Sequence, residues 1–348
     1  MGKKILCKII YTKYFIFLQY YYLHIIKIVE KMNITEKATD FVGKTPILKL
    51  NNLGKNIGAN IYAKMELFNP TSIKDRAVLN MVKSAISKGK IKKGTEVVEA
   101  SSGNTAIAIA SLGVMLGYKT KIFMSELCSE ERIKILCAYG AKVVLTPGKE
   151  HTKGARERGI EYCKANPNTS YFLNQHDNIE NGNAHILTTG PELWEQMEGK
   201  IDAIVIGLGT SGTFEGLSTF MKNKNEKIKI IAYEPEASPV YAGGEQGKHK
   251  IIGVGPGFIT NNFVRAKKNM DELIHVSDEI AFEWVLKIAQ KEGILVGPSS
   301  AGAAWVATEL AKRKEFENKN IVCFFYDPGE RYLSTQGLFN MDNVEIVL

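Results

Sequence analysis

The stretch Glu96-Val97-Val98-Glu99-Ala100-Ser101-Ser102-Gly103-Asn104-Thr105 decides the fold class of this chain. Its first half is β-rich, and its second half is a loop of small polar residues. Residues 105–116 are apolar and mostly small, which predicts a helix buried on most sides. A second β-rich run occupies residues 120–124. A strand, a helix and another strand in this order predict a βαβ unit, in a parallel sheet that helices cover on both faces.

The same alternation extends in both directions from this unit. The other predicted strands are residues 61–65, 141–145, 203–206, 228–233 and 321–326. The other predicted helices are residues 75–88, 130–139, 212–221, 277–292 and 301–313. We therefore expect an α/β protein with two mostly parallel sheets, one on each side of about residue 178. This gives an N-terminal domain of residues 34–178 and a C-terminal domain of residues 179–348. Residues 242–257 are irregular and glycine-rich, which makes them a candidate active-site loop.

Composition and charge restrict the kinds of ligand and partner that we expect for this protein. The 348 residues are 45% hydrophobic and 24% charged, which is ordinary for a globular protein. The net charge is +8, but residues 1–31 contribute +5 of it, and no basic run carries interleaved aromatic residues. We therefore expect no nucleic-acid partner. The five cysteines include no Cys-x-x-Cys and the six histidines no paired-ligand spacing. This favours a reducing, cytoplasmic setting without a disulfide framework or a metal site.

Residues 1–33 form an N-terminal extension that differs from the rest. They are rich in Lys, Ile, Tyr and Phe, and the apolar part is interrupted by Gln19, His24 and Lys27. That part is too short for a confident membrane-spanning helix, and no small-residue cleavage site follows it. We interpret Met32 as the natural start. The alternative is an anchor or targeting segment, and we expect no membrane partner unless this segment is real.

Three polar motifs point to one cofactor. Asn69-Pro70-Thr71-Ser72-Ile73-Lys74-Asp75-Arg76 places a lysine after a short polar turn. Residues 101–105 can bind a carboxylate. Gly209-Thr210-Ser211-Gly212-Thr213 follows an apolar run and predicts an anion site at a helix N-terminus. Pyridoxal phosphate needs an amine partner and a phosphate cradle, and its substrates carry a carboxylate.

Each motif alone has a simpler interpretation. A lysine followed by aspartate and arginine is typical of a solvated helix start. Residues 101–105 could be an ordinary helix cap. Gly207, Gly209 and Gly212 match the G-x-G-x-x-G of a dinucleotide site, which is the local competitor. The order of the three motifs along the chain, and their occurrence together, therefore decide between these interpretations.

Taken in order, the motifs resemble the cysteine synthase (O-acetylserine sulfhydrylase) group of fold-type II pyridoxal-phosphate enzymes. The resemblance covers residues from about 34 to 339. Further matching segments are Gly43–Ile47, Lys64–Pro70, Gln175 with His185–Glu192, Gly253–Phe258 and Asp327–Ser334. It implies a two-domain fold like that of the tryptophan synthase β-subunit, with pyridoxal 5'-phosphate as cofactor.

The resemblance also implies residue roles. Lys74 is expected to form the Schiff base and then act as general base. Asn104 is expected to donate to the cofactor's ring oxygen, and Ser300 to face its pyridine nitrogen. Ser299 stays an alternative to Ser300, because residues 297–302 are one longer than the family's G-I-S-S-G. The expected phosphate ligands are Gly209, Thr210, Ser211, Gly212 and Thr213. The expected substrate-binding residues are Ser101, Ser102, Thr105, Gln175 and Gly253.

The implied reaction is β-replacement, in which O-acetylserine and sulfide give L-cysteine through an α-aminoacrylate. Three departures leave the substrate open: Ser101 stands for threonine, Ala106 for glycine, and one residue is missing before Ser72. The alternatives are a cysteine desulfhydrase or lanthionine-forming enzyme that releases hydrogen sulfide, and then a serine/threonine dehydratase. A silent scaffold protein or a nicotinamide-dependent oxidoreductase would leave the Lys74 motif unexplained. The resemblance further implies a homodimer, and in some members a serine acetyltransferase partner.

Overall fold

The computed structural model describes residues 35–55 and 57–340. The expected extension of residues 1–33, and the interpretation of Met32 as the start, lie outside these residues. The chain divides at residues 40 and 41 into two units. The short 3-10 helix η1 (Ala38–Phe41) lies at their boundary in the sequence, and everything below concerns the second unit.

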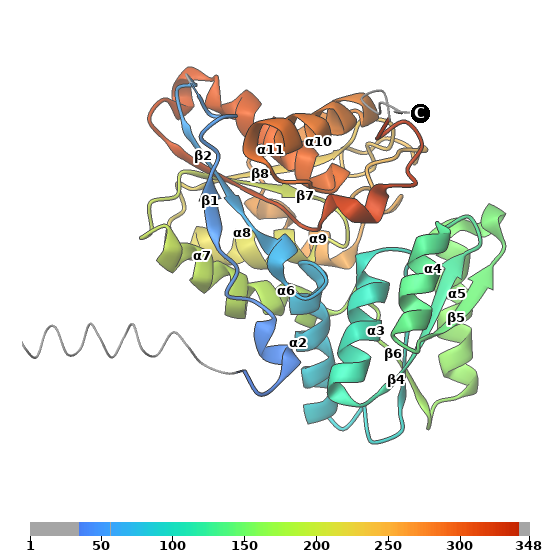
Figure 1. Ribbon diagram of the computed structural model, residues 1–348. Coiled ribbons are helices and arrows are strands. Elements are labelled where there is room, and N and C mark those ends of the chain that lie inside the picture. The colour runs from blue at the N-terminus through green and yellow to red at the C-terminus, as the bar shows by residue number, and fades with distance from the viewer. Residues whose placement is uncertain (1–34, 56, 341–348) are drawn as a thin grey trace, which may run out of the picture. The chain divides into compact units, whose positions relative to one another are not determined.

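The larger sheet has six strands in the order β1-β2-β10-β7-β8-β9. The pair β1–β2 is antiparallel, and the other neighbours are parallel. The bounds are β1 (Ile47–Lys49), β2 (Asn60–Lys64), β10 (Asn320–Phe324), β7 (Ala203–Gly207), β8 (Lys229–Pro235) and β9 (Glu272–Val276). Helices α10 (Asp278–Glu292) and α11 (Pro298–Ala311) cover one face. Helices α7 (Gly190–Gln196) and α8 (Gly212–Lys224) lie on the other face (Figure 1).

The smaller sheet has four parallel strands in the order β5-β4-β3-β6. They are β5 (Lys142–Thr146), β4 (Lys119–Ser125), β3 (Glu96–Ala100) and β6 (Ser170–Phe172). The chain runs from β3 to β5 in one direction and then returns to β6. Right-handed crossovers therefore place α3 (Asn104–Leu116) and α4 (Glu130–Ala138) on one face, and α5 (His151–Ala165) on the other.

The remaining helices connect the two sheets. Helix α2 (Lys74–Ser87) packs against α3 on one side and α6 (Ile179–Ala184) on the other. A π-helical turn, η4 (His185–Thr189), joins α6 to α7, and α9 (Asn261–Ala266) packs against α8. The short 3-10 helices are η2 (Glu66–Phe68), η3 (Gly148–Glu150), η5 (Lys267–Asn269), η6 (Lys314–Phe316) and η7 (Gly329–Tyr332). Among the described residues, no helix has the length and apolar character needed to cross a bilayer.

The expectation that the sheets divide near residue 178 is wrong for the N-terminal strands. Strand β2 pairs with β10 along its whole length, from Asn60 opposite Asn320 to Lys64 opposite Phe324. The apolar core follows the same division, because residues 50–73 share a buried cluster with residues 193–338. The physical reason is that β1 and β2 form only a two-stranded ribbon by themselves, which needs a larger sheet to bury its faces.

Candidate active site

A cleft of about 810 Å³ lies where loops from both sheets meet. Its walls include Lys74, residues 100–105, Gln175 with His176, Gly209 with Thr210, and much of the segment 246–256. The loops after β3 and β7 leave the carboxyl ends of parallel strands, which is where open α/β sheets bind ligands. The prediction that residues 242–257 include an active-site loop is consistent with this wall.

Lys74 begins helix α2 at the edge of the cleft. The turn before it is closed by Asp75, whose carboxylate accepts hydrogen bonds from the Thr71 backbone N–H at 2.6 Å and the Thr71 hydroxyl at 2.5 Å. Among the described residues, the Lys74 amine makes no hydrogen bond or ion pair. Burial lowers the pKa of Lys74 to about 8, while the negative charge of Asp327 acts in the opposite direction. A substantial fraction of this amine is therefore neutral near physiological pH, as a nucleophile requires.

The loop of residues 101–105 and Gln175 lie together in the cleft, as the sequence predicts. The Thr105 hydroxyl donates to Oε1 of Gln175 at 2.6 Å, which fixes the Gln175 amide. Beneath them, the buried carboxylate of Glu99 accepts the backbone N–H groups of Ala100 at 2.8 Å and Gln175 at 3.0 Å. Burial raises the pKa of Glu99 to about 7. The substrate-binding role of these residues, and of the cleft-lining Gly253, stays a prediction.

Gly209 and Thr210 reach the cleft, whereas Ser211, Gly212 and Thr213 begin helix α8 behind them. A Cβ on Gly209 would stand 2.2 Å from the carbonyl oxygen of Gly253, so this close approach requires glycine. Ser211 adopts φ +59°, and its hydroxyl bonds to Tyr241 at 3.1 Å. The Thr213 hydroxyl bonds to the His185 ring at 3.2 Å. The helix N-terminus supplies free N–H groups and a positive dipole end for an anion.

The two residues predicted to contact the cofactor ring, Asn104 and Ser300, differ in whether they line the cleft. Asn104 lines it. Ser300 is fully buried at the start of α11, and its hydroxyl accepts the backbone N–H of Tyr326 at 2.8 Å. Ser300 is not among the residues that line the cleft, and neither is Ser299, which lies beside Gly253. The choice between Ser299 and Ser300 stays open.

The sequence analysis missed His176, which lines the cleft directly after Gln175. Its ring lies edge-on to Phe258 at 5.1 Å, and Nδ1 has no hydrogen-bond partner among the described residues. Burial lowers the pKa of His176 to about 4, so the ring is neutral. The available signal was the resemblance itself, since the family's segment that matches Gln175 reads Q-F, with phenylalanine where this chain has His176. Ala106, another departure, belongs to the buried core.

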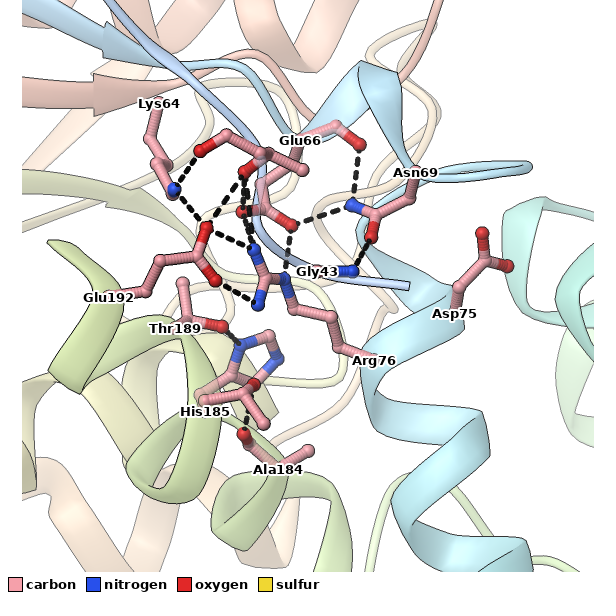
Figure 2. Close-up of polar contacts among 12 residues, drawn as sticks. Gly43, Lys64, Glu66, Asn69, Asp75, Arg76, Ala184, His185, Thr189 and Glu192 are labelled. Carbon is pink, nitrogen blue, oxygen red and sulfur yellow. Dashed lines mark hydrogen bonds and ion pairs between the residues drawn. The ribbon is translucent and has the colours of Figure 1, made fainter. Parts of the chain in front are cut away.

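A buried ionic cluster lies beside the cleft, and Figure 2 shows it. The Arg76 guanidinium lies between Glu66, with Nε to Oε2 at 2.7 Å, and Glu192, with Nη1 to Oε2 at 3.0 Å. Lys64 donates to Oε1 of Glu192 at 2.5 Å. The cluster uses the Gly43–Ile47, Lys64–Pro70 and His185–Glu192 segments, which supply no residue to the cleft. It anchors helix α2, which begins with Lys74, to α7.

The donor set fits pyridoxal phosphate. The cleft combines an unpaired amine at Lys74, an amide at Asn104 and a glycine-tight turn at a helix N-terminus. An aldehyde can react with the first, a ring oxygen can accept from the second, and a phosphate can bind at the third. Among the described residues that line the cleft, the other lysine is Lys248.

Comparisons with known proteins agree with this geometry. Residues 38–327 match the model of a family described as pyridoxal-phosphate dependent enzyme. The chain is similar to a probable cysteine synthase of Bacillus subtilis, with 42% identity over 87% of this chain and 98% of the relative. It is also similar to the crystal structure of a cysteine synthase from Entamoeba histolytica, with TM-score 0.85, 37% identity, and 90% and 94% of the two chains covered.

A third similarity is to a hydrogen sulfide-producing enzyme from Fusobacterium nucleatum. Its crystal structure has TM-score 0.82 and 36% identity, and the match covers 86% of this chain and 100% of that one. The family match and the level of identity confirm the expected fold and cofactor class. The chain therefore belongs to the pyridoxal-phosphate-dependent enzymes, in the cysteine synthase group.

Proposed function

We propose that this enzyme forms L-cysteine from O-acetylserine and sulfide, with pyridoxal phosphate attached at Lys74. The observation that carries the proposal is the unpaired amine of Lys74 in a cleft shared with residues 101–105, Gln175 and the Gly209 turn. The relatives named as cysteine synthases support the choice of reaction.

Each part of the cleft has one task in this proposal. Gly209–Thr213 bind the phosphate, and Asn104 donates to the ring oxygen. Ser101, Ser102, Thr105 and Gln175 offer several convergent donors to the substrate carboxylate. When bound, the cofactor supplies the electron sink for loss of the α-proton and the β-substituent. Lys74, released by the substrate amine, accepts the α-proton at Nζ, for which a pKa of about 8 is suitable.

Release of sulfide from L-cysteine is the second candidate. It is favoured by the solved neighbour named as a hydrogen sulfide-producing enzyme. His176 adds to it, because a neutral imidazole in the cleft offers one hydrogen-bond donor and one acceptor to a thiol or a water. The two reactions differ in which group leaves the β-carbon and which group adds to it.

Spectroscopy of the purified protein separates these candidates. The bound cofactor gives a visible band, which we expect to be lost in Lys74→Ala. O-acetylserine should change the band, and sulfide should restore it with release of L-cysteine. If L-cysteine changes the band and releases sulfide while O-acetylserine has no effect, the second candidate is correct. Absence of any band from protein reconstituted with the cofactor would contradict both.

The remaining expectations join this proposal. We infer a cytoplasmic homodimer, and domains that divide near residue 178 apart from strands β1 and β2. A serine acetyltransferase is the proposed protein partner, with its C-terminus in the cleft. Sedimentation of the purified protein tests the dimer. Competition between the partner's C-terminal peptide and O-acetylserine tests the complex.

A further inference from the structure

The segment after β10 contacts two loops that face the proposed cofactor site. Arg331, in η7, donates from Nη1 to Oδ1 of Asn104 at 2.6 Å and from Nη2 to the carbonyl oxygen of Thr71. Thr71 lies in the turn that precedes Lys74. One guanidinium therefore fixes the Lys74 segment relative to the Asn104 loop. The proposed function gives no role to Arg331 or to its neighbour Asp327.

The same segment also bonds the other end of the Asn104 amide. Nδ2 of Asn104 donates to Oδ2 of Asp327 at 2.6 Å. A guanidinium has only donors, so it must face the amide oxygen, and an ionised carboxylate has only acceptors, so it must face the amide nitrogen. A flipped amide would lose both bonds. The amide nitrogen keeps one further N–H, and Asn104 lines the cleft.

Asp327 is a buried carboxylate, and both of its hydrogen-bond donors lie on one oxygen. It is 0% exposed, and the Tyr332 hydroxyl donates to its Oδ2 at 2.5 Å. A Cβ on Gly297 would stand 2.3 Å from Oδ1, so glycine leaves the space for this carboxylate. Burial raises the pKa of Asp327, while its two donors and the charges of Arg331 and Arg132 lower it. Its negative charge also acts on Lys74. The positive charges of Arg331 and Arg132 favour the ionised form of this carboxylate, but burial is the larger effect and leaves the pKa of Asp327 above its ordinary value.

We propose that Asp327 and Arg331 are positioning residues, which orient the Asn104 amide so that its remaining N–H points to the ring oxygen of the cofactor. The inference rests on the cofactor-binding role proposed above for Asn104. It assigns a task to the C-terminal signature, which lies 223 residues or more from Asn104 in the sequence.

The test compares Arg331→Met with Arg132→Met. Both variants remove a half-buried positive charge that acts on Asp327, but only Arg331 contacts Asn104. Arg132 instead lies over the Tyr332 ring at 5.6 Å. Each apoprotein is titrated with pyridoxal phosphate, and the dissociation constant and the wavelength of the visible band are recorded. We expect Arg331→Met to weaken binding at least about tenfold and to shift the band. Arg132→Met should weaken binding less than about threefold, without a shift.

A second pair covers the case in which Arg331→Met does not fold, as judged by thermal unfolding of the apoprotein. Asp327→Asn places an amide against Asn104 and so frees its orientation, whereas Tyr332→Phe removes only a hydroxyl. We expect a band shift in the first and none in the second. If the two variants of a folded pair changed cofactor binding and the visible band equally, the inference would be wrong. The proposed function would still hold in that case, provided that the wild-type protein binds the cofactor at Lys74. A wild-type protein that bound no cofactor would overturn both.

Discussion

Lys64 and Lys74 are ten residues apart, and their amines have opposite surroundings. Lys64 donates to the carbonyl oxygen of Thr45 at 2.5 Å, to Glu192 at 2.5 Å and to Gln196 at 2.8 Å. These three acceptors use all three N–H bonds of an ammonium group. The Lys74 amine has no acceptor among the described residues, and it lines a cleft.

The difference separates a structural lysine from a reactive one. Burial lowers the pKa of both amines, but for Lys64 the hydrogen bond and charge of Glu192 oppose this effect. For Lys74 only the charge of Asp327 does so, and its pKa is about 8. A saturated ammonium joins secondary structure elements, whereas an unpaired amine can exchange protons and attack carbonyl groups. Four substitutions or titrations test this contrast.

Lys74→Ala should have the largest effect on activity. We expect kcat/KM to fall at least about 10³-fold, because the variant lacks both the attachment point and the general base. The apoprotein should not lose thermal stability, since no partner is left unpaired and the change removes a buried amine whose pKa is lowered. Initial rates with O-acetylserine and sulfide, and calorimetry of the apoprotein, measure the two quantities. A variant with near-normal rates would remove the proposed role of Lys74.

Lys64→Met should have the largest effect on stability. The change removes one donor and one positive charge from the Glu192 carboxylate and the donor that Oε1 of Gln196 uses. We expect a loss of about 3 kcal/mol in the free energy of unfolding. Urea titration of the apoprotein measures it. The folded fraction should still bind the cofactor. A stability loss below about 1 kcal/mol would show that Arg76 alone satisfies Glu192.

The pH dependence of apoprotein stability should distinguish Lys74 from an ordinary exposed lysine. The pKa of Lys74 in the folded protein, about 8, lies below the ordinary lysine value of 10.5, so between these values the unfolded chain binds more protons. The contribution of Lys74 to apoprotein stability therefore rises with pH across this window. Wild type should gain stability relative to Lys74→Met between about pH 8 and about pH 10.5. Urea titrations at several pH values measure the free energy of unfolding of both proteins. If this free energy changed with pH by the same amount in the two proteins, the assigned pKa would be wrong.

Lys200→Ala is the matched control with the smallest expected effect. Lys200 pairs with Glu198 at 2.6 Å, but both side chains are at least 70% exposed. Water screens such a pair, so we expect no resolvable change in the unfolding midpoint or in kcat/KM. If this variant were as damaged as Lys64→Met, burial would not be the property that distinguishes the paired lysines.

Periodicity in the sequence predicted elements better than it predicted their partners. The strand predicted at 96–100 matches β3, and the helix predicted at 105–116 matches α3 within one residue. Helix α5 was missed because its sequence, His151–Ala165, has a weak apolar stripe and three charged residues in Arg156-Glu157-Arg158. The assignment of β2 to the wrong sheet has another cause. Strand pairing joins residues 260 positions apart, and no local pattern encodes it.

The predictions for the candidate site also succeeded for local features and failed for contacts between distant segments. Lys74 and Asn104 were identified from short polar motifs and Gln175 from the family resemblance, and the structure brings all three to one cleft. His176 and the contacts of Asp327 with Asn104 were not foreseen. A single histidine has no spacing signal, and a buried carboxylate is visible only once the chain has folded around it. Hydrogen-bond geometry, unlike periodicity, depends on distant segments.

The position of β10 has a consequence for the order in which the protein can fold during synthesis. This strand lies between β2 and β7, yet among the strands of residues 35–55 and 57–340 it is the last to leave the ribosome. The four-stranded sheet is complete once residue 172 has emerged. The N-terminal ribbon, made first, has an unpaired edge until residue 324 arrives. Nascent chains halted before β10 therefore expose the unpaired edges of β2 and β7. Such edges can pair with strands of other chains, which leads to aggregation unless a chaperone covers them.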